Sequence, residues 1–123
     1  MIKKTKILWL TKPESHDYTA ASSYLTLLFK EEAVAINVKK LKKAKISHFK
    51  AKDIFRASCL SLLGVSNSHV TDDKKKILSG VKLSPVLLLR DTTNAKLIIA
   101  DGYHRLCAVY FYDEDALIPC KII

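Results

Sequence analysis

The residues best suited to chemistry in this sequence lie in one short turn, made of Asp101, Gly102, Tyr103, His104 and Arg105. An apolar run precedes the turn and a helical pattern follows it. The unpaired N–H groups of that helix would therefore be exposed at the end of a strand. Glycine lets a ligand approach the backbone closely, and the helix dipole adds about half a positive charge. We expect the turn to bind a phosphate-like anion.

The side chains of this turn have two open interpretations. In the first, Arg105 makes paired hydrogen bonds to phosphate oxygens, and His104 donates another or moves a proton near neutral pH. Asp101 is the only acid in the turn that could hold Mg²⁺ or act as a base, so Asp101 and His104 are the candidates for catalysis. In the second, Asp101 caps the helix and Arg105 pairs with Asp101 or with the acidic loop at 113–115.

The second half of the chain has the clearest sequence patterns for the strands and the helix that position this turn. Apolar runs at 85–90 and 96–100, joined by a polar turn, predict a β-hairpin. A helical pattern at 103–112 and a strand at 117–123 follow. Both hairpin runs are apolar at nearly every position, which predicts that helices cover both faces of the sheet.

The first half of the chain predicts mostly helices, and the fold class is α+β: a small mixed β-sheet packed with helices. We expect a single domain, with a helical, basic part at 1–62 and a core at 63–123. The expected earlier elements are a strand at 6–10, a helix capped by Asp17, a helix from Glu31 through Leu41, an extended piece at 46–49, a helix at 52–63 ended by Gly64, and a helix from a Thr71 cap to Gly80.

The positive charge of the protein lies in its first half. The formal net charge is +9; residues 1–60 hold thirteen Lys and Arg against five Asp and Glu, whereas residues 61–123 hold eight against seven. This charge raises a second class of function, a module that binds DNA or RNA, and a third, a regulatory, antitoxin-like partner of an acidic protein. Lysines near the negative end of a helix also have a structural explanation. The nucleic-acid candidates are Lys39, Lys40, Lys42 and Lys43.

The amino-acid composition limits the classes of protein to which this chain can belong. The chain is 49% hydrophobic and 27% charged, which is typical of a globular protein, and no apolar stretch approaches the roughly 20 residues that span a bilayer. The apolar run near the N-terminus is too short for a signal peptide, so we expect a cytoplasmic protein with no membrane partner. Cys59, Cys107 and Cys120 are widely spaced and odd in number, which favours buried free thiols.

Residues 65–123 resemble the ParB/sulfiredoxin superfamily. The shared pattern is a polar segment with an asparagine, a helix, the run SPVLLLR, a hairpin, the stretch IIADGYHRLCAVYF and a closing IPCKI. In that family the glycine-led turn binds nucleotide phosphates, and sulfiredoxins carry Gly-Cys-His-Arg there. The resemblance implies Gly102, His104 and Arg105 as phosphate contacts, with Tyr103 between them. It also implies ATP or CTP as ligand, with Mg²⁺, and leaves nucleotide hydrolysis or phosphotransfer open.

Where the sequence departs from the family pattern, it argues against the two known activities of the family. Tyr103 stands where sulfiredoxins have their catalytic cysteine, and Cys107 lies one helical turn further on, which argues against sulfinic-acid repair. The ParB turn, Gly-Glu-Arg-Arg with a further Arg and Ala, is matched only at Gly102, Arg105 and Ala108, which argues against a ParB-like clamp. The resemblance therefore supports phosphate binding more than either known activity.

Three residues before and within the preceding helix are second candidates for nucleotide contacts. Asn67 and His69 come just before the expected helix, where family members often contact nucleotide, and Lys75 could face a phosphate. Their structural interpretation is a turn-former, a surface histidine and a solvated lysine. Both interpretations stay open at this point.

Overall fold

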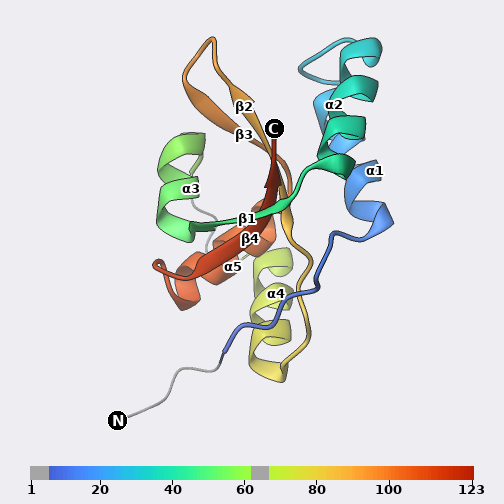
Figure 1. Cartoon of the computed structure of the whole chain (residues 1–123). Helices are drawn as coiled ribbons and strands as arrows, with labels where there is room; N and C mark the ends of the chain where they lie inside the picture. The colour runs from blue at the N-terminus through green and yellow to red at the C-terminus, as the bar shows by residue number, and fades with distance from the viewer. Residues whose placement is uncertain (1–5, 62–66) are drawn as a thin grey trace.

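The computed structural model describes residues 6–61 and 67–123 (Figure 1). In these residues the chain forms five helices and a four-stranded sheet, so the predicted α+β class is confirmed. The helix predicted at 52–63 ends earlier than expected, at Ser58, because Cys59 adopts a left-handed conformation with φ of +57°; Gly64 itself lies outside the described residues. The elements are α1 Ser15–Leu25, α2 Glu31–Lys43, β1 Ile46–Lys50, α3 Ala51–Ser58, α4 Ser68–Ser79, β2 Val86–Asp91, β3 Lys96–Asp101, α5 Tyr103–Tyr112 and β4 Leu117–Ile122.

The sheet is mixed, with strand order β1-β4-β2-β3. The predicted hairpin forms from β2 and β3, which pair antiparallel. After β3 the chain crosses over through α5, so that β4 runs parallel to β2 and is held between β2 and β1. The extended piece predicted at 46–49 is therefore the edge strand β1, which pairs antiparallel with β4.

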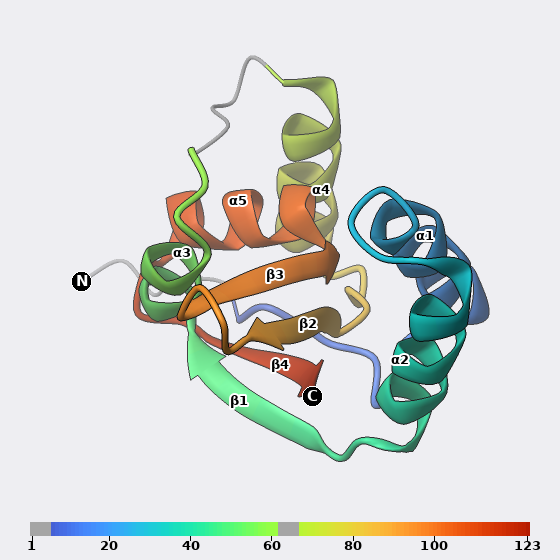
Figure 2. The same ribbon diagram turned by 90° about the horizontal axis from the view of Figure 1, so that it is seen from above.

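Helices cover both faces of the sheet, as the unbroken apolar strands predicted (Figure 2). Because side chains alternate along a strand, β2 sends Leu88 to one face and its neighbours Leu87 and Leu89 to the other. Leu88 belongs to a core with residues of α3, α4 and α5, including Leu106. Leu87 and Leu89 belong to a second core with residues of α1 and α2, including Leu25.

The strand predicted at 6–10 is not part of the sheet. Trp9 makes an isolated parallel bridge with Leu83, and the Leu10 N–H donates to the Leu83 carbonyl at 2.8 Å. Both edges of β2 are taken by β3 and β4, and the segment bridges instead to Leu83, in the chain that leads into β2.

Two predicted helix caps were wrong. Helix α1 begins at Ser15, and Asp17 accepts the Glu14 N–H at 2.9 Å from inside the first turn. Helix α4 begins at Ser68, because Asn67 accepts from the N–H groups of the second and third helical residues. Thr71 consequently lies within the helix rather than at its start.

All three cysteines are free, as predicted, but Cys59 is exposed while Cys107 and Cys120 are buried. Burial raises the pKa of Cys120 to about 11. Within residues 6–61 and 67–123, no helix combines the length and apolar character that crossing a membrane requires.

Candidate functional site

The predicted turn joins β3 to α5 directly. Strand β3 ends at Asp101, Gly102 adopts a left-handed conformation with φ of +105°, and α5 begins at Tyr103. A Cβ at Gly102 would lie 2.5 Å from Cγ1 of Val86 and 2.9 Å from Nη2 of Arg105. Both the backbone and the packing against β2 therefore require glycine here.

The turn forms one wall of a polar pocket of about 240 Å³, and α4 forms the other. The N-cap of α5 is Gly102, which has no side chain to cap the helix, and the Asp101 carboxylate accepts from Arg105 instead. Helix α4 contributes residues at helical spacing, which places them on one face. The lining residues are His69, Asp72, Asp73, Lys76, Asp101, Gly102, Tyr103, His104 and Arg105.

Arg105 is held by two carboxylates. Its Nη2 lies 3.1 Å from Oδ2 of Asp101, and its Nη1 lies 3.8 Å from Oδ1 of Asp17, a buried residue of α1. Nη2 also approaches the carbonyl oxygen of Pro85 at 3.5 Å, and Nε is buried with no hydrogen-bond partner among residues 6–61 and 67–123. The pairing of Arg105 with Asp101 was one of the two interpretations of the sequence; the contact with Asp17 was not foreseen.

The carboxyl group of Asp101 is poorly solvated. Burial raises its pKa, the neighbouring Asp17 carboxyl raises it further, and the Arg105 guanidinium opposes both. Two carboxyl groups beside one guanidinium leave an excess of negative charge when both are ionised. This cluster links α1 to the turn and makes Asp101 a structural partner of Arg105 more than an open ligand for a metal ion.

Two histidines face each other across the pocket. The ring centroids of His69 and His104 lie 4.8 Å apart. Burial lowers the pKa of His104, and the charge of a protonated His69 lowers it further, while Asp73 opposes the shift. At neutral pH the imidazole of His104 is therefore largely uncharged, and an added anion would favour its protonation.

Helix α4 adds an acid and a base that the sequence analysis did not select. Asp73 is buried, and burial raises its pKa despite the Lys76 ammonium, whose Nζ lies 3.7 Å from Oδ1 of Asp73. With His69, these residues follow an i, i+4, i+7 spacing. That spacing in the sequence could have identified them as one face of a helix.

Tyr103 lines the pocket, but its hydroxyl group is already engaged by the chain that follows α3. Its hydroxyl group donates to the carbonyl oxygen of Ser61, and its ring packs edge-on to Phe55 with centroids 6.4 Å apart. Burial raises the pKa of Tyr103, and Cys107 raises it further. The phenol is therefore neutral and helps to hold the end of α3 against α5.

Of the three second candidates for nucleotide contacts, only one lies in the lining of the pocket. His69 lines the pocket, whereas Asn67 serves as the N-cap of α4 and accepts the backbone N–H of His69 at 3.0 Å and that of Val70 at 3.3 Å. Lys75 is exposed and lies outside the pocket lining, where its neighbour Lys76 stands instead. The structure thus brings together the 101–105 turn with His69, and not with Asn67 or Lys75.

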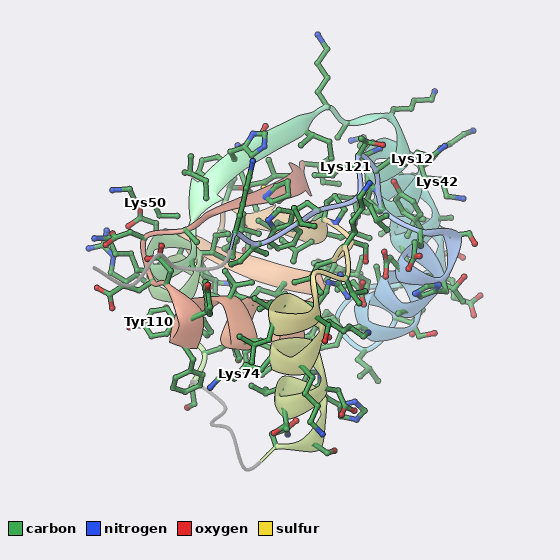
Figure 3. The ribbon with its side chains drawn as sticks, turned by 90° about the horizontal axis from the view of Figure 1, so that it is seen from below. Lys12, Lys42, Lys50, Lys74, Tyr110 and Lys121 are labelled. Carbon is green, nitrogen blue, oxygen red and sulfur yellow. The ribbon has the colours of Figure 1, made fainter. Side chains whose placement is uncertain are left out.

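The lysines of the first half form a separate surface at the end of α2. Lys42 and Lys121 lie on the same side of the molecule (Figure 3), with their ammonium groups 5.6 and 5.8 Å from the ring centroid of Tyr18. Lys121 is buried and donates to the carbonyl oxygen of Lys42 at 2.7 Å. The nucleic-acid candidates Lys39, Lys40, Lys42 and Lys43 are all exposed on this helix.

No protein-family description, curated protein or solved structure significantly matches this chain. The resemblance to the ParB/sulfiredoxin superfamily therefore stays a prediction from the sequence motif.

Proposed function

We propose that this protein binds the phosphate groups of a nucleotide, ATP or CTP, at the start of α5. The observation that carries the proposal is the first turn of α5, whose N-cap Gly102 supplies no side-chain cap and which borders a polar pocket with two imidazoles, an ammonium group and three carboxylates. Unpaired N–H groups and the positive end of a helix dipole favour a phosphate. His69, Lys76 and His104 supply further donors.

In this proposal Arg105 is a positioning residue. Its guanidinium is occupied by Asp101 and Asp17, so a phosphate would have to displace a carboxylate to reach it. The ion pairs instead fix the turn and the backbone N–H groups that follow it. The contacts with phosphate fall to those N–H groups and to the imidazoles, which differs from the clamp that the family resemblance implies.

Mg²⁺ enters the proposal only as a companion of the nucleotide. Asp101 is hydrogen-bonded to Arg105, whereas Asp72 is an exposed carboxylate in the pocket wall. Carboxylates that meet a nucleotide's Mg²⁺ usually keep several waters on the ion, which suits an exposed position. If the nucleotide is turned over, His104 is the group in the pocket best suited to accept a proton, because its imidazole is largely neutral.

Calorimetric titration with ATP, CTP and inorganic phosphate, each with and without Mg²⁺, tests the proposal. Replacing both histidines (His69→Asn with His104→Asn) should weaken nucleotide binding by about tenfold or more, because charge-assisted hydrogen bonds are lost. The matched control is His48→Asn, an exposed histidine on β1 outside the pocket, which should bind as the wild type does.

The same titration at several pH values gives an independent readout. Because a bound phosphate stabilises imidazolium, binding should strengthen as the pH falls from about 8 to 6. Absence of heat with wild-type protein, or undiminished binding by the double histidine variant, contradicts the proposal.

A second candidate function is nonspecific binding of nucleic acid by the end of α2. It is favoured by the ring of Tyr18 beside the ammonium groups of Lys42 and Lys121, since an aromatic ring among cations is a common element of single-strand sites. Its signature is affinity that falls steeply with salt and with charge reversal at Lys39, Lys40, Lys42 and Lys43, while the histidine variants have no effect.

A further inference from the structure

A second pocket lies at the opposite end of β3, between α3 and the β2–β3 hairpin, which run close together in Figures 1 and 2. Its volume is about 410 Å³. Small-molecule sites in proteins typically measure about 300–1,000 Å³ and are mostly apolar. The apolar walls are Phe49, Ile54, Leu88, Leu97 and Ile122.

The pocket exists because the helices leave part of one sheet face uncovered. Leu88 pairs with Ile122 on β4, and Arg90 pairs with Leu97 on β3, so all four side chains lie on the same face. Helix α3 has only eight residues and ends at Ser58. An eight-residue helix is about 12 Å long, and the pocket lies between this short helix and the hairpin.

The polar rim of this pocket carries two cations: Lys96, whose charge acts on the carboxylate of Asp91, and Arg90. The carboxylate of Asp53 pairs with Arg56 at 2.9 Å, and that of Asp91 accepts from the Asn94 side chain at 2.8 Å. Asn94 lowers the pKa of Asp91, which keeps it ionised and engaged, and Lys96 lies close enough to add to that shift. Among the described residues, the guanidinium of Arg90 has neither an ion pair nor a hydrogen bond to a side chain.

We propose that this pocket binds a small amphipathic carboxylate. Its apolar body lies against Leu88, Leu97 and Ile122, and its carboxylate pairs with the guanidinium of Arg90. An apolar wall beside an exposed guanidinium matches a ligand with an apolar body and one anionic end. The pocket volume of about 410 Å³ suits a free small molecule.

This site is independent of the nucleotide proposal. Strand β3 rises about 3.3 Å per residue, so its first residue, Lys96, and its last, Asp101, lie about 16 Å apart. The two pockets share no lining residue. Either proposal can therefore fail without the other.

The test compares octanoate with 1-octanol, which share an apolar chain and differ in charge. Binding is measured from the NMR shifts of the methyl groups of Leu97 and Ile122. The methyl groups of Leu27, an exposed residue outside the pocket lining, serve as the reference. Octanoate should shift the pocket methyl groups at lower concentration than 1-octanol. Equal affinity for the two, or shifts confined to Leu27, would overturn the proposal.

Substitutions at two exposed positions test the charge of Arg90 and the free volume of the pocket separately. Arg90→Gln should weaken octanoate binding by about tenfold and leave 1-octanol unchanged, because only the ion pair is lost. Ala57→Phe, which places a ring in the pocket, should abolish both. Matched controls are Lys39→Gln and Ala35→Phe, both exposed on α2, which should bind as the wild type does.

Some results with these variants would contradict the proposed carboxylate site. Octanoate binding that survives Ala57→Phe, or that is equally reduced by Lys39→Gln and Arg90→Gln, contradicts the assignment. Should Ala57→Phe not fold, Arg90→Gln decides alone, since its side chain is exposed and makes no contact that the fold needs.

Discussion

The two ends of β3 carry pockets of opposite character. At the Asp101 end the walls are polar, and Arg105 is fixed between two carboxylates. At the Lys96 end the walls are mostly apolar, and Arg90 stands exposed at the rim. The same residue type therefore has a structural task at one end and is available to a ligand at the other.

The difference shows that an arginine near a turn identifies a binding site only together with its neighbours. Buried carboxylates beside Arg105 already satisfy most of its charge, so a ligand at that end must rely on backbone N–H groups and imidazoles. Arg90 has no such neighbours among the described residues. Substitutions at matched positions of the two ends can break or sharpen this comparison.

The largest expected difference concerns the two arginines. Arg105→Met leaves two carboxyl groups without their cation in a buried cluster and should lower the free energy of unfolding by about 3–5 kcal/mol. Arg90→Met should change it by no more than about 0.5 kcal/mol, as is usual at exposed positions. Denaturant unfolding of both variants measures this.

A second change checks the physical reason for that loss. Adding Asp101→Asn to Arg105→Met removes one of the stranded carboxylates, so the double variant should recover part of the lost stability. Equal unfolding free energies for the two arginine variants would contradict the assigned difference.

The next difference concerns two left-handed residues that flank β3. Gly102 has a φ of +105° and no room for a Cβ, so Gly102→Ala should cost about 2–4 kcal/mol through backbone strain and overpacking. Ala95, in the hairpin turn, has a φ of +51°. Ala95→Gly should stabilise the fold by about 0.5–1 kcal/mol, because it relieves that strain. Thermal unfolding of the two variants should shift in opposite directions; a shift in the same direction argues against the described turns.

The smallest difference is one of pH dependence, at an acid in each pocket. Burial raises the pKa of Asp73 above its ordinary value of 3.8, so its ionisation costs stability as the pH rises through the raised pKa. Asp73→Asn should therefore gain stability relative to the wild type between about pH 3 and 7.

Asp91 should show the opposite sign. Asn94 lowers its pKa, so the stability it contributes is present at neutral pH and is lost as the pH falls through the lowered pKa. Asp91→Asn should be the less stable protein at neutral pH and approach the wild type in acid. Denaturant unfolding across the pH range measures both, and parallel curves for the two variants would contradict the assigned environments.

The local elements were predictable where the sequence signal is local. The helix at 103–112 was predicted to the residue, because a strand-breaking Gly102 precedes it and an acidic loop follows it. The hairpin and the covering of both sheet faces followed from its apolar runs. The segment at 6–10 has the same local pattern as a strand, but in the structure it bridges to Leu83 outside the sheet, which no local pattern indicates.

The candidate site was predictable only in part. The turn itself was found from its residue types, and the spacing of His69, Asp73 and Lys76 contained the second wall. The contact of Asp17 with Arg105 joins residues that are far apart in sequence, and no local pattern indicates which distant acid reaches a buried guanidinium. The sequence sets Arg105 apart by its place in the 101–105 turn, but whether carboxylates occupy a given arginine depends on which acids the fold brings near it.

The central place of β4 in the sheet has a consequence for how the chain is made. Strand β1 has its pairing partner only in β4, whose first residue is synthesised about 70 residues later. At typical rates of about 5–20 residues per second, the ribosome exposes β1 for several seconds before β4 exists. During that interval His48 and Lys50 keep the waiting strand polar, which protects the nascent chain from pairing with another copy of itself.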